Sequence, residues 1–426
     1  TLVDALDTLV VLRNYSEFAH AIDLILKHVD FNRDVNVSVF ETNIRVLGGL
    51  LSGHLLAKMS FLPSGYIYRG GLLKLAYDLG KRLLHAFNTP TGIPYGTINL
   101  KYGVPANETT VASTAGAGTY ILEFGILSLL TGDERFEIAA RRALRSIFAR
   151  RSSIGLVGQH IDVITGEWTH RDASIGAGAD SFYEYLYKAY LVFRDREYLH
   201  MFNVLYQAVG DWLKKDAFYV EVQMNTGQVV WPVFNSLASF WPGLQILVGD
   251  KEAAVQTHLK YHMLWRRFSG LPEGYNLQTR QAMPGQKRYP LRPELGESAF
   301  YLHEVTNASH LLFAGRDMVN SLLQFCRTEC GFAELDDVET HAQADQQASF
   351  FLAETTKYLF LLFEPDPTTM GKRNTNVVFT TEGHIIPLDL LARPELWIND
   401  RLYNRSSRHS SDAAVPVCTD LWTHCP

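Results

Sequence analysis

The sequence predicts an all-α protein whose paired helices close into an α/α barrel. Apolar residues recur every three or four positions in one segment after another, which is the period of an amphipathic helix. Between those segments begin helices of another kind, which mix small residues, aromatic residues and carboxylates, near residues 40, 113, 180, 236, 294 and 348. A short hairpin rich in β-branched residues, "NVVFTTEGHIIPL" at 376–388, follows the last of them.

The spacing of the mixed helices predicts the architecture. One of them begins every roughly 55 to 75 residues, which suggests stacked helical hairpins, each with one inner and one outer helix. In a closed ring, outer helices cover one side of an inner helix and the other side faces a shared cavity, so carboxylates can stand among apolar residues. An open solenoid also fits the spacing. It does not readily explain why polar residues fall on the same helix of every unit.

The remaining elements follow in chain order. Further amphipathic helices are expected at 17–29, 40–59, 72–87, 136–149, 198–215 and 253–268. Two short hairpins, "IDVITGEWTH" at 161–170 and "VEVQMNTGQVVW" at 220–231, carry Thr-Gly between alternating residues, and we expect them at one rim of the ring. We expect one barrel domain over 1–395 and a tail over 396–426 that packs on the barrel or leaves it.

The composition limits the classes of partner. A chain of 426 residues that is 47% hydrophobic can bury a large core. Its formal net charge of -6 argues against a nucleic-acid or anionic-membrane surface, and the basic segment "RRALRSIFARR" at 141–151 is predicted to be a solvated helix face. No apolar run approaches the roughly 20 residues of a membrane span, so none is expected. The opening "TLVDALDTL" is typical of a helix interior, so we expect the natural N-terminus to lie upstream.

Sequons and cysteines bear on the compartment. Several Asn-x-Ser/Thr sequons favour the secretory pathway. They lie at Asn14, Asn36, Asn107, Asn307 and Asn404. Cys326 and Cys330 stand four apart on a predicted helix, where a disulfide fits poorly, so both are expected to be buried thiols. Cys418 and Cys425 either close a small loop or pair with another protein.

Carboxylates on the mixed helices are the first candidate site residues. Glu41 and Arg45 are four apart, share a helix face and can form an ion pair, which is usually a surface pair. Asp180 and Glu184 place two like charges on one face of an aromatic-rich helix. Such a pair costs free energy unless a cation or a proton compensates it.

A second group of acids stands next to the hairpin in this scheme. Glu294 and Glu297 fall in the first turns of one helix, and Glu354 is the lone acid in a long apolar stretch, where an unpaired charge would be costly. A hairpin that rises through the ring would bring Thr381 and Glu382 among these acids. Ca²⁺ takes about 6 to 8 oxygen ligands, and a threonine offers both its hydroxyl and its carbonyl. The sequence therefore indicates a cation site, a sugar site, or both.

Seven motifs resemble those of glycoside hydrolase family 47, the class I α1,2-mannosidases, in the family's order across nearly the whole chain. They are "TLVDALDTL", "FETNIRVLGGLLSGHLLA", "GADSFYEYLYKA", "GLPEGY", "RPELGESAFYLHEVT", "SFFLAETTKYLFLLF" and "FTTEGH". Within that family, the motif sequences are most similar to those of the ER degradation-enhancing α-mannosidase-like (EDEM) proteins. The resemblance implies an (α/α)7 barrel plugged by the C-terminal hairpin, with Ca²⁺ at the hairpin tip. It also implies inverting hydrolysis of terminal α1,2-linked mannose.

The resemblance assigns roles motif by motif. The catalytic positions are Glu41 as proton donor, directly or through a water, Asp180, Glu273, and Glu294 as general base. Substrate contacts are assigned to Arg292, Phe350, Glu297 and Glu382. Thr381 is expected to bind Ca²⁺ directly, and Glu184, Glu297, Glu354 and Glu382 through water. Arg45 beside Glu41 would lower the pKa of that acid, so the sequence does not choose between Glu41 and Asp180 as proton donor.

The expected function is a calcium-dependent α1,2-mannosidase that trims high-mannose N-glycans of misfolded glycoproteins in the ER lumen for degradation. A mannose-binding receptor with weak catalysis, and an ER or Golgi processing α1,2-mannosidase, are the alternatives. Gly178 stands where the ER α-mannosidase I proteins carry a branch-holding arginine, which leans against the processing role. The resemblance also suggests a disulfide-isomerase partner for Cys418 and Cys425.

Overall fold

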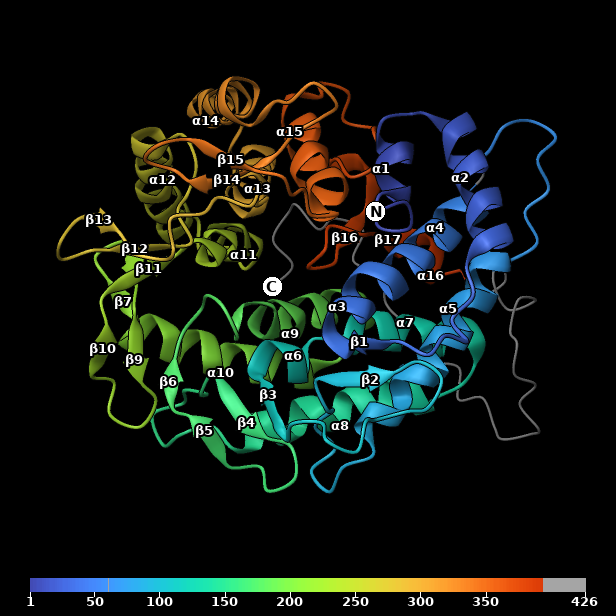
Figure 1. The fold of residues 1–426 in the computed structure, drawn as a ribbon, viewed down its shortest axis with the longest axis horizontal. Coiled ribbons are helices and arrows are strands. Elements are labelled where there is room, and N and C mark those ends of the chain that lie inside the picture. Colours follow the sequence, from blue (N-terminus) through green and yellow to red (C-terminus); the bar gives the residue numbers. More distant parts are fainter. Residues whose placement is uncertain (60, 394–426) are drawn as a thin grey trace.

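The computed structural model describes residues 1–59 and 61–393, and their helices form a ring with an inner and an outer layer (Figure 1). Seven inner segments line the ring in this part of the chain. They are α1 (Leu6–Val11); α3 (Val39–Glu41), η1 (Thr42–Leu47) and α4 (Gly48–Lys58); α6 (Thr114–Gly118) and α7 (Ile121–Thr131); α9 (Asp180–Phe193); η3 (Ser236–Phe240) and α11 (Trp241–Leu247); α13 (Glu294–Thr306); and η5 (Phe351–Thr355) and α15 (Thr356–Phe363). The ring closes where α1 packs between α4 and α15, and the Thr8 hydroxyl donates to the Leu352 carbonyl at 2.9 Å.

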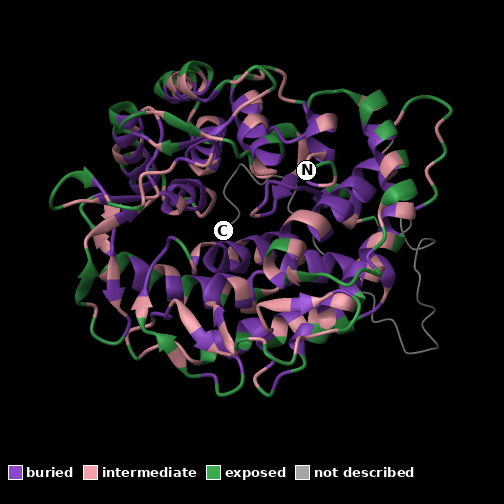
Figure 2. Ribbon diagram, in the orientation of Figure 1, coloured by how far each residue is buried: buried purple, intermediate pink, exposed green. Residues whose placement is uncertain are grey.

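The outer layer consists of longer amphipathic helices, each packed on the inner segment that precedes it. They are α2 (Tyr15–His28), α5 (Gly71–Leu84) with η2 (His85–Phe87), α8 (Arg135–Ala149), α10 (Arg196–Trp212), α12 (Lys251–Phe268), and α14 (Ser309–Ser321) with η4 (Leu322–Cys326). An outer helix buries one stripe, as α8 does with Phe136, Ala140, Leu144 and Ile147. Inner helices are buried on almost every side (Figure 2). The expected α/α barrel is therefore confirmed.

The inner helices begin close to the positions that the sequence predicts. Mixed helices expected near 40, 113, 180, 236, 294 and 348 begin at Val39, Thr114, Asp180, Ser236 and Glu294, and the last of them at Phe351. The spacing did not reveal α1 as a member of the ring, because α1 has only six residues and stands at the start of the chain.

The C-terminal hairpin enters the ring. β16 (Val377–Phe379) pairs antiparallel with β17 (Ile385–Pro387), and Phe379 lies opposite Ile385. Every residue of both strands is buried, and the Phe379 ring contacts Phe300, Tyr301 and Tyr358. This apolar packing holds the hairpin inside the barrel, as expected. The 3-10 helix η6 (Arg373–Thr375) precedes it and α16 (Leu388–Leu391) follows.

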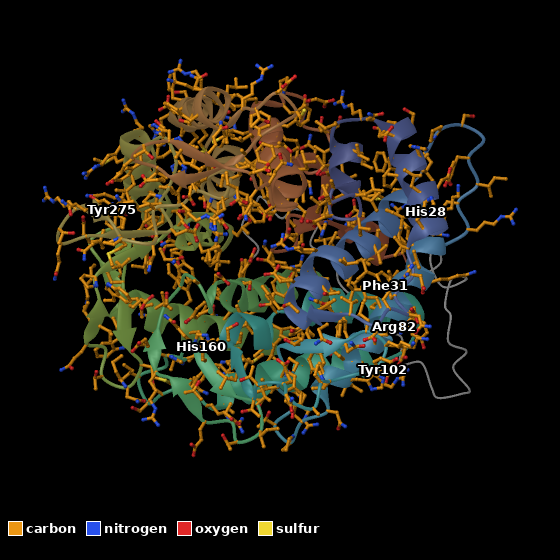
Figure 3. The ribbon with its side chains drawn as sticks, viewed as in Figure 1. His28, Phe31, Arg82, Tyr102, His160 and Tyr275 are labelled. Carbon is orange, nitrogen blue, oxygen red and sulfur yellow. The ribbon has the colours of Figure 1, made fainter. Side chains whose placement is uncertain are left out.

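Short sheets connect the helices, and both predicted Thr-Gly hairpins are present. β4 (His160–Asp162) pairs with β5 (Trp168–His170), and β9 (Glu221–Gln223) pairs with β10 (Val229–Trp231). The other strands are β1 (Asn36–Ser38), β2 (Thr97–Asn99), β3 (Val111–Ser113), β6 (Asp172–Ala173), β7 (Lys214–Lys215), β8 (Phe218–Tyr219), β11 (Val233–Asn235), β12 (Gly274–Asn276), β13 (Gln281–Ala282), β14 (Glu334–Asp337) and β15 (Ala342–Ala344). Side-chain contacts tie these connections to the outer layer: Arg82 of α5 donates to the Leu100 carbonyl at 2.8 Å, in the loop that carries Tyr102 (Figure 3).

Two expectations need correction. Residues 114–131 are apolar and long enough to cross a membrane by length and composition, although no such run was expected. That window is 83% buried inside the ring and is interrupted between α6 and α7, so it is a pair of core helices. Cys326 ends η4 and is buried, whereas Cys330 is exposed beyond the helix, because the chain turns back and Arg327 bridges Phe332.

Further predictions concern the surface and the tail. Both Cys326 and Cys330 are free thiols. Four sequon asparagines are exposed, namely Asn14, Asn36, Asn107 and Asn307. Asn404, Cys418, Cys425 and the tail over 396–426 lie outside the described residues.

Candidate active site

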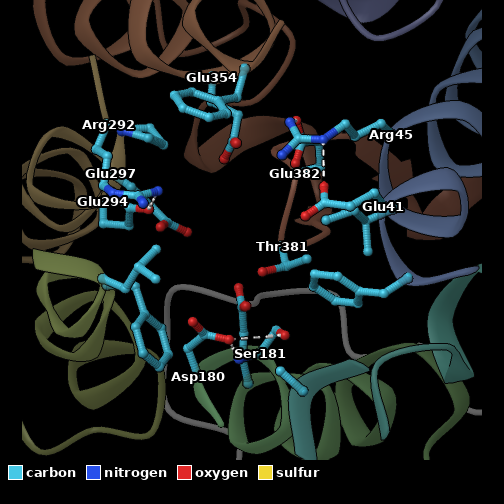
Figure 4. Close-up of a pocket in the computed structure, with 18 of the residues that line it drawn as sticks. Glu41, Arg45, Asp180, Ser181, Arg292, Glu294, Glu297, Glu354, Thr381 and Glu382 are labelled. Atoms are coloured by element: carbon cyan, nitrogen blue, oxygen red, sulfur yellow. Dashed lines mark hydrogen bonds and ion pairs between the residues drawn. The ribbon is translucent and has the colours of Figure 1, made fainter. Parts of the chain in front are cut away.

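A cavity of about 360 Å³ lies at the hairpin tip, where six of the seven inner segments, all but α1, contribute lining residues (Figure 4). Every predicted site residue except Glu273 lines it. Those residues are Glu41, Asp180, Glu184, Arg292, Glu294, Glu297, Phe350, Glu354, Thr381 and Glu382, together with Arg45. The structure therefore brings together acids that are hundreds of residues apart in sequence.

Helix ends explain why these side chains meet. Asp180 and Glu294 are the first residues of α9 and α13, so both carboxyls lie at the cavity end of their helices. Glu354 lies in the π-helix η5, a rare element that is frequent at functional sites. The hairpin turn brings Thr381 to the cavity, and Gly383 allows it with a φ of +67°. A Cβ at that glycine would stand 3.0 Å from Glu354 Cγ.

Arg45 joins two of the predicted acids. Its Nε donates to Glu41 Oε2 at 2.7 Å, and its Nη1 forms an ion pair with Glu382. Burial opposes the charge of Arg45, but the two carboxylates raise its pKa above the ordinary value. The predicted pairing of Glu41 with Arg45 is confirmed. It is not a simple surface pair, since it borders the cavity and reaches the hairpin.

Asp180 and Glu294 have acid strengths unlike those of surface carboxyls. Burial raises the pKa of Asp180 to about 6, against hydrogen bonds from the Ser181 backbone at 2.7 Å and hydroxyl at 3.3 Å. Burial also raises the pKa of Glu294 to about 7, although Arg292 at 3.9 Å acts in the opposite direction. Shifted carboxyls that face a cavity are typical of catalytic acid and base positions.

Glu273 reaches the site through Arg292. Arg292 Nε and Nη2 donate to the two oxygens of Glu273 at 2.7 and 2.8 Å, and the Ser236 hydroxyl donates to the same carboxylate at 3.2 Å. The sequence placed Glu273 among the catalytic acids. In the structure Glu273 does not line the cavity. It binds Arg292, which does, and so fixes the orientation of the Arg292 guanidinium.

A buried lysine supplies the cation that the sequence interpretation lacked beside Glu184. Lys188 forms an ion pair with Glu184, and its Nζ lies 4.0 Å from Glu297 Oε1. The side chains of Lys188 and Glu184 are 2% and 4% exposed, so neither charge is solvated. Lys188 follows Glu184 by four residues on α9, and that spacing is the signal that was missed.

Two further buried pairs escaped the sequence interpretation. Tyr185 donates to Glu123 Oε1 at 2.5 Å, and its hydroxyl accepts the Thr381 backbone N–H at 3.4 Å. Lys357 donates to Asp7 Oδ1 at 2.8 Å behind the hairpin. Their sequence signal is weak, because a polar residue in an apolar helix does not reveal its partner.

Several carboxylates line the same cavity as Thr381. Within residues 1–59 and 61–393, no group of three or more His, Cys, Asp or Glu is arranged to hold a metal directly. The predicted set is of another kind, since Thr381 alone would bind directly and the carboxylates through water. Glu354 fits that role: it is 4% exposed, and no residue in the described part of the chain donates a hydrogen bond to it. Burial and the nearby acids raise its pKa well above the ordinary value, which a cation would relieve.

Comparisons with known proteins agree with this geometry. The profile of glycosyl hydrolase family 47 matches residues 1–388. Alpha-mannosidase I MNS4 of Arabidopsis thaliana is 50% identical over 395 residues, which cover 91% of this chain and 63% of the relative. The human ER degradation-enhancing alpha-mannosidase-like protein 2 is 50% identical over 424 residues, 99% of this chain and 72% of the relative.

A solved structure shares the fold. The alpha-1,2-mannosidase from Trichoderma reesei superposes with a TM-score of 0.80 at 26% identity, over 91% of this chain and 90% of that one. The chain thus spans less than two thirds of the Arabidopsis relative and nearly all of the solved enzyme. The family profile, the two relatives and the shared fold agree that the chain belongs to glycosyl hydrolase family 47.

Proposed function

We propose that the protein is a calcium-dependent, inverting exo-α1,2-mannosidase that trims high-mannose N-glycans of misfolded glycoproteins in the ER lumen. The observation that carries the proposal is the convergence of Asp180, Glu294 and Glu41 on one cavity that ends at the Thr381 turn. The two relatives, an alpha-mannosidase I and an ER degradation-enhancing protein, and the solved alpha-1,2-mannosidase support the activity and the role.

Asp180 is the better proton donor of the two candidates. Burial raises the pKa of its carboxyl to about 6, so between pH 6 and 7 a fraction of the molecules has Asp180 protonated while Glu294, with a pKa of about 7, is ionised. Glu41, by contrast, forms an ion pair with the Arg45 guanidinium at 2.7 Å. A carboxylate in an ion pair is a poor proton donor. In the proposed step the Asp180 proton moves to the glycosidic oxygen as the bond from that oxygen to the anomeric carbon breaks.

Glu294 is the base of the same step. It takes a proton from a water whose oxygen bonds to the opposite face of the anomeric carbon, which inverts the configuration. Arg292 at 3.9 Å favours the carboxylate form that a base needs. Inverting enzymes keep their two carboxyls about 6.5 to 9.5 Å apart so that the water fits. An acid and a base on the separate helices α9 and α13 suit that requirement.

The hairpin tip is the proposed calcium position. Thr381 would hold the ion directly, while Glu184, Glu297, Glu354 and Glu382 would hold its waters. When bound, Ca²⁺ supplies positive charge that orients sugar hydroxyls at the end of the cavity. Arg292 and Phe350 also line the cavity, where they can contact the terminal mannose. A cavity that ends at the hairpin admits a chain terminus, which supports exo cleavage.

Gly178 supports the degradation role over the processing role. It has a φ of +86°, and a Cβ there would meet neighbouring atoms only at 3.9 Å, so this wall of the cavity has room. A wall without a branch-holding arginine constrains the glycan less. The disulfide-isomerase partner expected for Cys418 and Cys425 remains a prediction, which a non-reducing gel of the two proteins tests.

The direct test is mannose release. Purified protein is incubated with a nine-mannose N-glycan, with and without a calcium chelator, and the products are separated by chromatography. Release that stops with chelator and returns with added Ca²⁺ supports the proposal. Asp180→Asn serves as the inactive control. If the wild type binds the glycan yet releases no mannose at any Ca²⁺ concentration, the protein is a receptor. If mannose is released, the identity of the trimmed branch distinguishes the degradation role from the processing role.

A further inference from the structure

The turn that carries Thr381 is held from behind by a buried ion pair. Lys357 of α15 donates to Asp7 Oδ1 of α1 at 2.8 Å and to the Gly383 carbonyl at 2.6 Å. Both charged side chains are 0% exposed. Lys357 therefore contacts the backbone two residues beyond Thr381, and does so without lining the cavity.

Asp7 holds the next part of the same turn. Its Oδ2 accepts from the Ile385 backbone N–H at 2.9 Å and from the Ser52 hydroxyl at 3.1 Å. The Ser52 hydroxyl also lies 2.9 Å from the Ile385 carbonyl. Asp7 and Lys357 together bind the backbone of Gly383 and Ile385, which flank His384.

The His384 ring fills the space between two carboxylates. Its nitrogens lie 3.3 Å from Asp4 Oδ1 and 3.4 Å from Asp7 Oδ2. A Cβ at Gly48 would stand 2.7 Å from His384 Cδ2, so only glycine lets α4 approach this ring. The hairpin is thereby fitted to α1, α4 and α15 at once.

Burial of charges at this density needs a reason. Desolvation of an ion costs several kcal/mol, and a buried ion pair often stabilises a fold no more than apolar residues of the same size. Such a pair does fix the positions of the groups that it binds, because a buried charge is stabilised only when its partners lie in a few specific positions. Here the partners are backbone atoms of the turn. At the other end of the turn, the Thr381 N–H points to the Tyr185 hydroxyl at 3.4 Å.

We propose that Lys357 and Asp7 are positioning residues that fix the carbonyl and hydroxyl of Thr381 for the cation, through their hold on Gly383 and Ile385. This inference rests on the proposed function and extends it to residues outside the cavity. Neither residue touches substrate. Their effect should therefore appear first in cation affinity.

A second buried pair supplies a matched control. Lys372 donates to Glu304 Oε1 at 2.5 Å and to the Leu361 carbonyl at 3.1 Å, with side chains 6% and 4% exposed. It has the same chemistry as the pair behind the turn: a lysine, a carboxylate and a backbone carbonyl, all desolvated. No hydrogen bond or ion pair joins Lys372 to a residue from 380 to 385. Loss of Lys372 should thus cost stability without disturbing Thr381.

The test compares Ca²⁺ affinity in the wild type, Lys357→Met, Asp7→Asn and Lys372→Met. Calorimetric titration is carried out at a temperature where circular dichroism shows each protein folded. We expect the dissociation constant for Ca²⁺ to rise at least tenfold in Lys357→Met and Asp7→Asn, and to stay within twofold in Lys372→Met. Ser52→Ala, which removes a neutral contact to the turn, should fold in any case and weaken binding by a smaller factor.

The outcomes separate this inference from the proposed function. Unchanged affinity in Lys357→Met, or in Ser52→Ala if the charge variants do not fold, overturns the positioning role and leaves the mannosidase proposal intact. Equal weakening in Lys372→Met also overturns it, since general destabilisation would then be the cause. If the wild type itself binds no Ca²⁺, both the cation and the positioning role fail, while mannose release still reports on the enzyme.

Discussion

Arg292 and Glu273 form a two-point ion pair at the edge of the cavity, with nitrogen-oxygen distances of 2.7 and 2.8 Å. A guanidinium can make this planar contact and an ammonium group cannot. The pair fixes Arg292 beside the Glu294 carboxyl, 3.9 Å away. Glu273 thereby influences the site without entering it.

Arg292→Lys should raise KM for the glycan. The lysine keeps the charge but loses one of the two contacts to Glu273, so the cation can leave its position. An increase in KM of about tenfold, equivalent to about 1.4 kcal/mol of binding free energy, is expected. Steady-state kinetics measure it. Arg288→Lys is the control, because Arg288 pairs with Glu334 at 2.8 Å outside the cavity and should leave KM unchanged. An unchanged KM in Arg292→Lys would show that the two-point contact has no part in binding.

Asp180 and Glu41 can be separated by substitution and pH together. A general acid contributes about 10²- to 10⁴-fold to rate, so Asp180→Asn should lower kcat by that much. The donor must be protonated and the base Glu294 ionised, and burial raises the pKa of Asp180 to about 6 and that of Glu294 to about 7, so wild-type kcat should be highest between pH 6 and 7 and fall at higher pH. Glu41→Gln should keep that alkaline fall. If Glu41→Gln abolishes it and Asp180→Asn does not, the donor is Glu41.

Gly383→Ala should destabilise the protein and disturb the hairpin tip. Positive φ alone costs an alanine ~1–2 kcal/mol. The new Cβ would also lie 3.0 Å from Glu354 Cγ, which adds crowding. Gly285→Ala isolates the first effect, because Gly285 has a φ of +74° and nothing within 4 Å of its Cβ position. Urea unfolding should show a larger loss for Gly383→Ala. Equal losses of unfolding free energy in the two variants would mean that the Glu354 side chain moves away from the new Cβ at no cost in stability.

His258 should make the protein less stable in acid. Its ring on α12 is buried, and burial, with help from His262 and His310, lowers its pKa to about 3. In the unfolded chain the pKa of His258 has the ordinary value near 6.5, so between about pH 3 and 6.5 the unfolded chain binds a proton there and the folded chain does not. The free energy of unfolding should therefore fall as pH drops below about 6.5, by about 2 kcal/mol at pH 5.

Substitution identifies the contribution of His258. Urea unfolding at pH 7 and pH 5 should show a difference smaller by about 2 kcal/mol in His258→Leu than in the wild type. His200→Leu on the exposed face of α10 is the control and should behave as the wild type. If His258→Leu keeps the full pH dependence, other groups cause the loss of stability in acid.

The sequence alone determined the ring and the order of its parts. Apolar periodicity marks the outer helices other than α14, because a helix with one solvent-exposed face repeats its apolar residues every three to four positions. The mixed inner helices are marked by their carboxylates, and their starts at Asp180 and Glu294 match the observed ones. The hairpin at 376–388 is equally local, since two short β-branched runs on either side of a polar tip suffice to define it.

Only the tertiary structure decided which charges meet. Glu184 with Lys188 lies within one helix and could have been found from its spacing, but Lys357 with Asp7 joins residues 350 apart. Whether Glu41 faces solvent or the cavity depends on how Arg45 reaches Glu382 on the hairpin. Periodicity reports which side of a helix is buried, and it says nothing about the partner on the far side. Ion pairs and shifted pKa values arise from those partners, so they belong to the packed ring and not to any segment of the chain.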